Sequence, residues 1–172
     1  MKKIIINDNS LSDNDIDMEV VRVKGLVINS SNKILLAHNN NTYQFPGGHK
    51  EDNEKIDECI KREIKEETGI DVSVSDEPFL CIVTYDNNYF DTGKKVKNSI
   101  YYYRFITDSV PNLLNTHYDE LELATDFNLF YINFSELSDF LKKNEESGNI
   151  DVKILREMLI VIDEYNEIYG GI

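Results

Sequence analysis

The chain has 172 residues, of which 41% are hydrophobic, so it is long and apolar enough to bury the core of one domain. Its formal net charge of −14 argues against nucleic acid as a partner, because binding to a phosphate backbone depends on Lys and Arg. The same charge means that an anionic substrate needs local help, from metal ions or from a basic loop.

The N-terminus and the cysteines point to a cytoplasmic protein. Met1-Lys2-Lys3 precedes only three isoleucines, which are too few for the apolar core of a signal peptide. No segment of the sequence approaches the ~18 apolar residues of a membrane span, so we expect no membrane partner. Cys59 and Cys81 lack a metal-type spacing and lie in apolar surroundings, as expected for reduced, buried thiols.

We expect a single domain over residues 1–172 with three parts. Residues 1–19 form an acidic leader, interpreted either as loose chain or as a peripheral strand arm, 20–141 form the core, and 151–169 form a C-terminal helix. A short strand ends at Pro46, before two glycines. Runs of β-branched and other apolar residues predict the remaining strands, at 20–29, 33–38, 79–85, 99–107 and 127–133.

Two helices are predicted after the last strand. Ser135 is a good N-cap for a short helix, and Asp151 is one for a longer helix that ends at Gly170-Gly171. The longer helix should pack on the sheet, because five apolar residues fall near one of its faces: Val152, Leu155, Leu159, Ile162 and Tyr169. Strands around a central helix, with further helices at the end, predict an α/β fold of three layers with a mixed β-sheet.

The central helix is predicted at 54–68. Asp52 and Asn53 are good N-caps, no proline or glycine interrupts the run, and Gly69 supplies the residue that ends many helices. At ~100° per residue, its aliphatic side chains form one stripe. The stripe consists of Ile56, Cys59, Ile60 and Ile64.

Acidic side chains interrupt this buried stripe. Glu63 and Glu67 fall inside it and Glu66 lies at its edge. Half-buried carboxylates at this spacing are costly unless a cation compensates them, and oxygen ligands of this kind suit Mg²⁺ or Mn²⁺. The angles alone leave an alternative open, in which the three acids are a solvated patch of an acidic protein.

The spacing from Gly48 to Ile70 resembles the Nudix box, G-x5-E-x7-R-E-U-x-E-E-x-G-U with U aliphatic, and every specified position matches. The resemblance implies a Nudix-type α/β/α sandwich. It also implies a Mg²⁺-dependent hydrolase that cleaves a phosphoanhydride of a nucleoside diphosphate linked to a group X. Members of the family act on small molecules and many form homodimers, although nothing in the sequence identifies an interface.

The same resemblance assigns roles to residues of the box. Glu63, Glu66 and Glu67 are the expected metal ligands, with the backbone carbonyl of Gly47. Gly48, Glu54 and Gly69 are expected to be structural. The candidate catalytic residues of the box are Glu63, Glu66 and Arg62. We expect Arg62 to pair with Glu54 and hold the carboxylates in place. The alternative for this pair is an ordinary surface salt bridge.

The general base is open between the box and a later acidic loop. That loop offers Asp119, Glu120 and Glu122, of which Glu120 is the first choice. The alternative is that all three are solvated loop acids. His117 lies nearby, but a lone loop histidine is a weaker candidate.

Candidate substrate-binding residues lie outside the box. Tyr43, Phe45 and Tyr85 are aromatic rings that could stack a base, with core packing as the alternative for each. The long polar loop predicted at 86–98 contains three lysines, Lys94, Lys95 and Lys97. These lysines either bind substrate phosphates or form a solvated hairpin tip.

Two other functions remain open at this point. The chain either hydrolyses a non-nucleotide diphosphate with the same fold and metals, or is an inactive Nudix domain that senses a nucleotide. The intact acids Glu63, Glu66 and Glu67 argue against the inactive domain.

Overall fold

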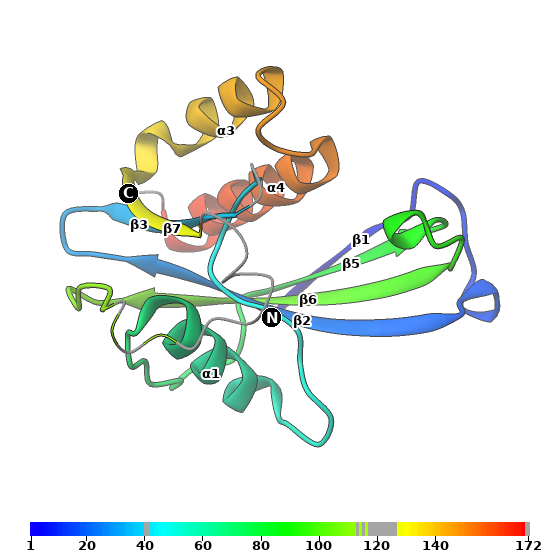
Figure 1. Cartoon of the computed structure of the whole chain (residues 1–172), viewed down its shortest axis with the longest axis horizontal. Coiled ribbons are helices and arrows are strands. Elements are labelled where there is room, and N and C mark those ends of the chain that lie inside the picture. The colour runs from blue at the N-terminus through cyan, green and yellow to red at the C-terminus, as the bar shows by residue number, and fades with distance from the viewer. Residues whose placement is uncertain (40–41, 113, 115, 117–126, 171–172) are drawn as a thin grey trace.

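A mixed β-sheet organises the protein (Figure 1). The computed structural model describes residues 1–39, 42–112, 114, 116 and 127–170. Its strands run in the spatial order β1-β5-β6-β2-β3-β4, with β7 paired to β3. They are β1 (Lys2–Ile6), β2 (Met18–Ile28), β3 (Lys33–Asn39), β4 (Thr42–Gln44), β5 (Leu80–Asp86), β6 (Val96–Ile106) and β7 (Asn128–Asn133).

The pairing is parallel in two places and antiparallel elsewhere. β2 runs parallel to β6 from Met18 opposite Val96 to Ile28 opposite Ile106, and β1 runs parallel to β5. β5 is antiparallel to β6, and β3 is antiparallel to β2, β4 and β7. The mixed sheet predicted from the sequence is therefore confirmed.

Helix α1 (Ile56–Thr68) covers one face of the sheet. Its Cys59, Ile60 and Ile64 are fully buried, and they pack against side chains of β2, β3 and β6. Gly69 ends the helix in the left-handed conformation, and its N–H donates to the carbonyl of Lys65 at 2.8 Å. The predicted stripe and the predicted helix end are both confirmed.

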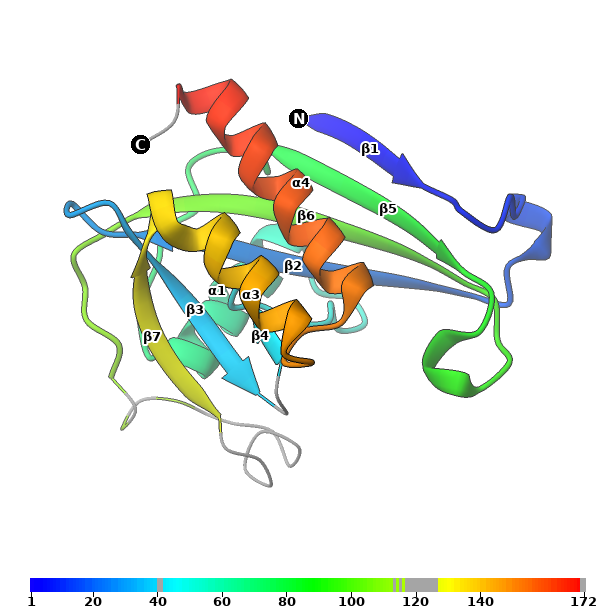
Figure 2. The same cartoon turned by 90° about the horizontal axis from the view of Figure 1, so that it is seen from above.

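Two helices cover the opposite face, α3 (Leu137–Glu146) and α4 (Val152–Tyr169), and Figure 2 shows α4 lying across the strands. Asp151 caps α4 by accepting a hydrogen bond from the Lys153 N–H at 2.7 Å. The packed face of α4 is shifted from the predicted one: Val152 and Tyr169 are exposed, whereas Met158, Val161 and Tyr165 join Leu155 and Ile162 in the core. Helices on both faces give the predicted α/β/α layers.

Three boundaries differ from the predictions. The leader contributes the edge strand β1 and the first two residues of β2. Helix α1 begins at Ile56 with Lys55 as its N-cap, because Glu54 is drawn away to Arg62. β6 begins at Val96, inside the predicted loop, because β2 and β5 pair with both of its edges there.

Candidate active site

The residues after β4 run alongside β2 and bring the Pro-Gly-Gly sequence next to α1. The carbonyls of Pro46 and Gly48 accept hydrogen bonds from the N–H groups of Gly25 (2.8 Å) and Val23 (3.0 Å). Gly47 lies between them with φ +142°, and a Cβ added there would lie 2.1 Å from the carbonyl oxygen of Val23. The Gly47 carbonyl takes no part in this pairing with β2.

Glu67 meets this segment from α1. Its Oε2 accepts a hydrogen bond from the Gly47 N–H at 2.9 Å, and the residue is only 4% exposed. A buried carboxylate is costly unless hydrogen bonds or a cation compensate its charge. Glu67 lies in the buried stripe of α1, as predicted.

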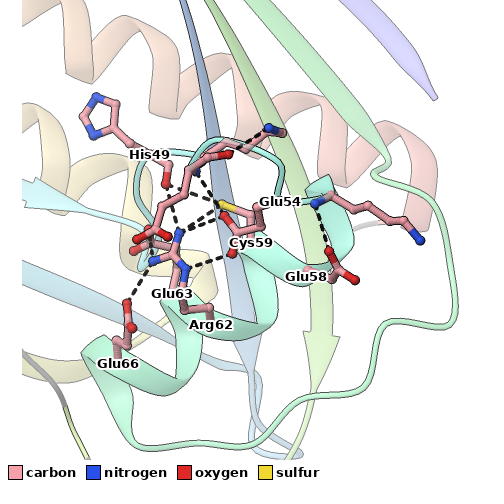
Figure 3. Close-up of polar contacts among 10 residues, drawn as sticks. His49, Glu54, Glu58, Cys59, Arg62, Glu63 and Glu66 are labelled. Carbon is pink, nitrogen blue, oxygen red and sulfur yellow. Dashed lines mark hydrogen bonds and ion pairs between the residues drawn. The ribbon is translucent and has the colours of Figure 1, made fainter.

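Arg62 is the centre of the polar contacts around the middle of α1 (Figure 3). It binds Glu54 through two nitrogens, with Nε to Oε1 at 2.8 Å and NH2 to Oε2 at 3.0 Å. Its NH1 donates to Glu63 at 2.8 Å and to Glu66 at 2.9 Å, and its NH2 donates to the His49 carbonyl at 3.1 Å. One guanidinium therefore ties the loop before α1 to two of the predicted metal ligands.

These contacts perturb the protonation of the partners. The Arg62 guanidinium lowers the pKa of Glu54 from 4.5 to about 2, and the hydrogen bond to Glu54 raises the pKa of Arg62. Burial raises the pKa of the neighbouring Cys59 thiol to about 12, so this cysteine stays an unreactive thiol at neutral pH. Cys59 and Cys81 are both free and buried, as expected.

Gly48 makes room for Glu63. A Cβ added to Gly48 would lie 2.4 Å from Glu63 Oε2 and 2.6 Å from its carboxyl carbon. The Glu63 side chain is 12% exposed and that of Glu66 is 34% exposed. Glu63 therefore sits in the stripe and Glu66 at its edge, in agreement with the predicted angles. The absence of a side chain at Gly48 sets the position of the Glu63 carboxylate.

The acid cluster, defined as Glu63, Glu66 and Glu67, has the donor chemistry of a site for a hard divalent cation. Its donors are all carboxylate oxygens. Two of its acids, Glu63 and Glu66, contact Arg62 together with Glu54, and Glu67 contacts the Gly47 N–H. Within the described residues, no three His, Cys, Asp or Glu side chains converge closely enough to hold a metal ion. In this structure Arg62 engages Glu63 and Glu66, so their carboxylates would have to turn from it to converge.

Two of the three aromatic rings predicted to bind substrate pack in or against the core. Phe45 is fully buried in the core on the α4 side, and Tyr43 packs among His38, Phe130 and Phe140. Of the two interpretations given for these rings, the structure supports core packing. The Tyr85 hydroxyl donates to Asp13 at 2.8 Å, near the far end of the sheet.

The three lysines of the predicted loop lie at the β5–β6 hairpin, at the end of the sheet away from α1 (Figure 1). Lys97 lies in β6 and not in a loop, and its Nζ pairs with Asp13 at 2.9 Å and Glu19 at 3.3 Å. The backbone N–H of Lys95 donates to Asp17, and Lys94 is exposed. The solvated-tip interpretation therefore suits Lys94, and Lys97 is neutralised by acids. Glu120 and its neighbours His117, Asp119 and Glu122 lie outside the described residues.

Comparison with known proteins decides the family, because the NUDIX domain model matches residues 18–152. The chain belongs to the Nudix family. A Vibrio atlanticus (strain LGP32) protein, "NAD-capped RNA hydrolase NudC", is 32% identical over 108 residues, which make up 60% of this chain and 36% of that protein. This chain therefore matches only about a third of the length of that curated relative.

A solved structure shares this fold. The MutT protein of Methanosarcina mazei Go1 has a TM-score of 0.56 at 18% identity, covering 86% of this chain and 95% of that one. A MutT protein from Bacillus halodurans has a TM-score of 0.49 at 21% identity, covering 70% and 72% of the two chains. Among the described residues of the present chain, no helix is both long and apolar enough to span a membrane.

Proposed function

We propose that this Nudix protein is a Mg²⁺-dependent pyrophosphohydrolase that cleaves a phosphoanhydride of a nucleoside diphosphate linked to a group X. The observation that carries the proposal is the acid cluster set into the buried stripe of α1, with Glu67 held against the Gly47 N–H at 2.9 Å. Burying carboxylates is costly in a protein with a formal charge of −14, and a bound cation would offset that cost.

The residues have distinct parts in this proposal. Glu63, Glu66, Glu67 and the carbonyl of Gly47 would hold the cation, with Mn²⁺ as an alternative to Mg²⁺. When bound, the cation neutralises phosphate charge, orients the phosphates and lowers the pKa of a water molecule. Arg62 and Glu54 fix the loop over the acid cluster, because their two-nitrogen contact joins the loop to the middle of α1. Glu120 is our candidate for the general base.

The substitution Glu67→Gln tests the proposal. We expect it to leave the fold intact and to reduce turnover by orders of magnitude, since an amide keeps the contact with the Gly47 N–H but loses the charge. Glu58→Gln is the matched control on the same helix, because Glu58 is exposed and its Oε2 caps the Lys55 N–H at 3.0 Å. Retained activity in Glu67→Gln would remove this residue from the site.

The substrate panel should separate the remaining alternatives. It should contain nucleoside triphosphates, dinucleoside polyphosphates, nucleotide sugars, a non-nucleotide sugar diphosphate and, because of the matched Vibrio atlanticus protein, NAD-capped RNA. The charge of −14 weighs against RNA, since no excess of Lys and Arg attracts its backbone. Release of phosphate-containing products with Mg²⁺ identifies the substrate class. Nucleotide binding without any turnover would favour the sensing domain.

A further inference from the structure

A buried lysine lies on the sheet face opposite α1. Lys24 of β2 is 6% exposed, and its Nζ lies 3.4 Å from Gln44 Oε1 and 3.7 Å from Glu157 Oε1. Both distances are long for a hydrogen bond of an ammonium group, which has three protons to donate. Burying an ammonium group is costly without close partners. Lys24 therefore has donor capacity that the described residues use poorly.

Charges of both signs act on Lys24: Arg22 is positive, and Glu157 and Glu67 are negative. Glu157 is its acidic partner on α4, and Glu157 also accepts a hydrogen bond from the Tyr102 hydroxyl. Arg22, two residues along the same face of β2, donates from Nε to His49 Nε2 at 3.0 Å and from NH2 to the Tyr89 hydroxyl at 2.7 Å. Arg22, Lys24 and His49 are called the basic cluster below.

The protonation behaviour of Lys24 agrees with this geometry. Burial lowers the pKa of Lys24, although Glu157 opposes the change. The burial of Lys24 therefore outweighs the attraction of its acidic neighbours Glu157 and Glu67.

An unpartnered amide faces the same side of the sheet. In the register of β2 and β6, Asn98, Ile100 and Tyr102 lie opposite Val20, Arg22 and Lys24, so Asn98 is a diagonal neighbour of Arg22. Asn98 is 6% exposed, and its Oδ1 is buried without a hydrogen-bond partner within the described part of the chain. A buried acceptor of this kind calls for a donor, such as a ligand hydroxyl.

A single stretch of backbone separates the basic cluster from the acid cluster. The Lys50 N–H donates to Val21 and the Val23 N–H donates to Gly48, so this stretch follows β2. The His49 ring of this stretch accepts a hydrogen bond from Arg22, and Figure 3 shows the ring pointing away from Arg62. The His49 carbonyl accepts a hydrogen bond from Arg62. Gly47 donates to Glu67 from the same stretch. This stretch therefore contacts both clusters.

We propose that Lys24, Arg22 and Asn98 form a subsite for an acidic or phosphorylated sugar as the group X of the substrate. Lys24 and Arg22 bind the anionic group of the sugar, and Asn98 Oδ1 accepts a hydrogen bond from one of its hydroxyls. This inference rests on the proposed function, because it places the phosphoanhydride at the acid cluster and X across the backbone stretch. Lys24 is then a specificity-determining residue.

The test compares UDP-glucuronic acid with UDP-glucose, which differ in one carboxylate on the sugar. Dissociation constants are measured by calorimetry with EDTA present, where the proposed hydrolysis does not occur. We expect the wild-type protein to prefer UDP-glucuronic acid by on the order of tenfold, the effect of one charge-assisted contact. The overall charge of −14 repels the more anionic ligand, so this preference requires a local positive site.

Three variants make the test specific. Lys24→Met removes the charge, keeps an unbranched side chain of nearly the same length, and should abolish the preference. Glu157→Gln removes the acidic partner, keeps an oxygen for the Tyr102 hydroxyl and should strengthen the preference. Lys97→Met is the matched control, because Lys97 lies on the other face of the sheet and pairs with Asp13 and Glu19. It should bind both ligands like the wild type.

The outcomes separate the subsite from the proposed function. The absence of a preference in the wild type, a preference that survives Lys24→Met, or an equal loss in Lys97→Met would overturn the subsite. Glu67→Gln should lose hydrolysis and keep the preference for UDP-glucuronic acid. A wild-type protein that shows this preference but hydrolyses no phosphoanhydride would retain the subsite and refute the proposed function.

Discussion

Replacing Gly48 by alanine should displace one carboxylate of the acid cluster while the acids themselves are kept. The new Cβ would lie 2.4 Å from Glu63 Oε2, so the flexible Glu63 side chain must move away. The stability cost is the contact between Glu63 and Arg62, a partly exposed hydrogen-bonded ion pair of about 1 kcal/mol. In a chain of this size that loss lowers the melting temperature by about 2–4 °C. A misplaced catalytic group costs about 100-fold in rate, and we expect kcat/KM to fall by that factor.

The assay for Gly48→Ala combines thermal unfolding with steady-state kinetics on the substrate found by the panel. Gly148→Ala is the matched control: Gly148 has φ +73° with open space around it, so the variant costs about 1–2 kcal/mol of backbone strain and moves no carboxylate. We expect it to lose similar stability and to keep its activity. A Gly48→Ala protein whose kcat/KM stays within about twofold of the wild type would refute the role given to the Glu63 position.

Other predictions concern stability and substrate binding. Arg62 depresses the pKa of Glu54 to about 2 from 4.5, so the contribution of Glu54 to stability is fully present above pH 4.5 and is lost as the pH falls toward 2. Urea unfolding should therefore show Glu54→Gln to be less stable by about 1–2 kcal/mol at pH 7, after allowance for solvent screening, with the difference closing near pH 2; a difference that is independent of pH would contradict this. Phe45→Ala should cost about 3–5 kcal/mol because the ring is fully buried, and a rise in KM without such a loss would return Phe45 to the substrate site. Lys97→Ala should leave KM unchanged because Asp13 neutralises Lys97, and a clear rise in KM would restore its phosphate-binding role.

Local signals in the sequence predicted the central helix well. The uninterrupted run before Gly69, with its aliphatic stripe, predicted 54–68, and the structure has Ile56–Thr68. The same angles predicted the burial of Glu67, because a helical wheel depends only on the spacing of residues. The start of the helix depends on a distant partner, since Arg62 takes Glu54 out of the first turn, and no local signal reports that contact.

Tertiary pairing accounts for what the sequence missed. Lys97 and Asn98 read as loop residues, yet β2 and β5 hold them in β6 from both sides. Lys24 alternates with apolar neighbours along β2, a pattern typical of a strand with one solvated face. Because α4 covers that face, Lys24 is buried instead, and only the packing of a helix more than a hundred residues later reveals it.

The uptake of a divalent cation is the most direct test of the central claim, that the acid cluster of α1 exists to hold one. Calorimetric titration with Mg²⁺, repeated with Mn²⁺, should show saturable binding in the millimolar range or tighter to the wild-type protein and to Glu58→Gln. The same titration should show binding weakened at least tenfold in Glu67→Gln, which removes a buried charge from the cluster. No uptake by the wild type, or equal uptake by Glu67→Gln, would contradict the account.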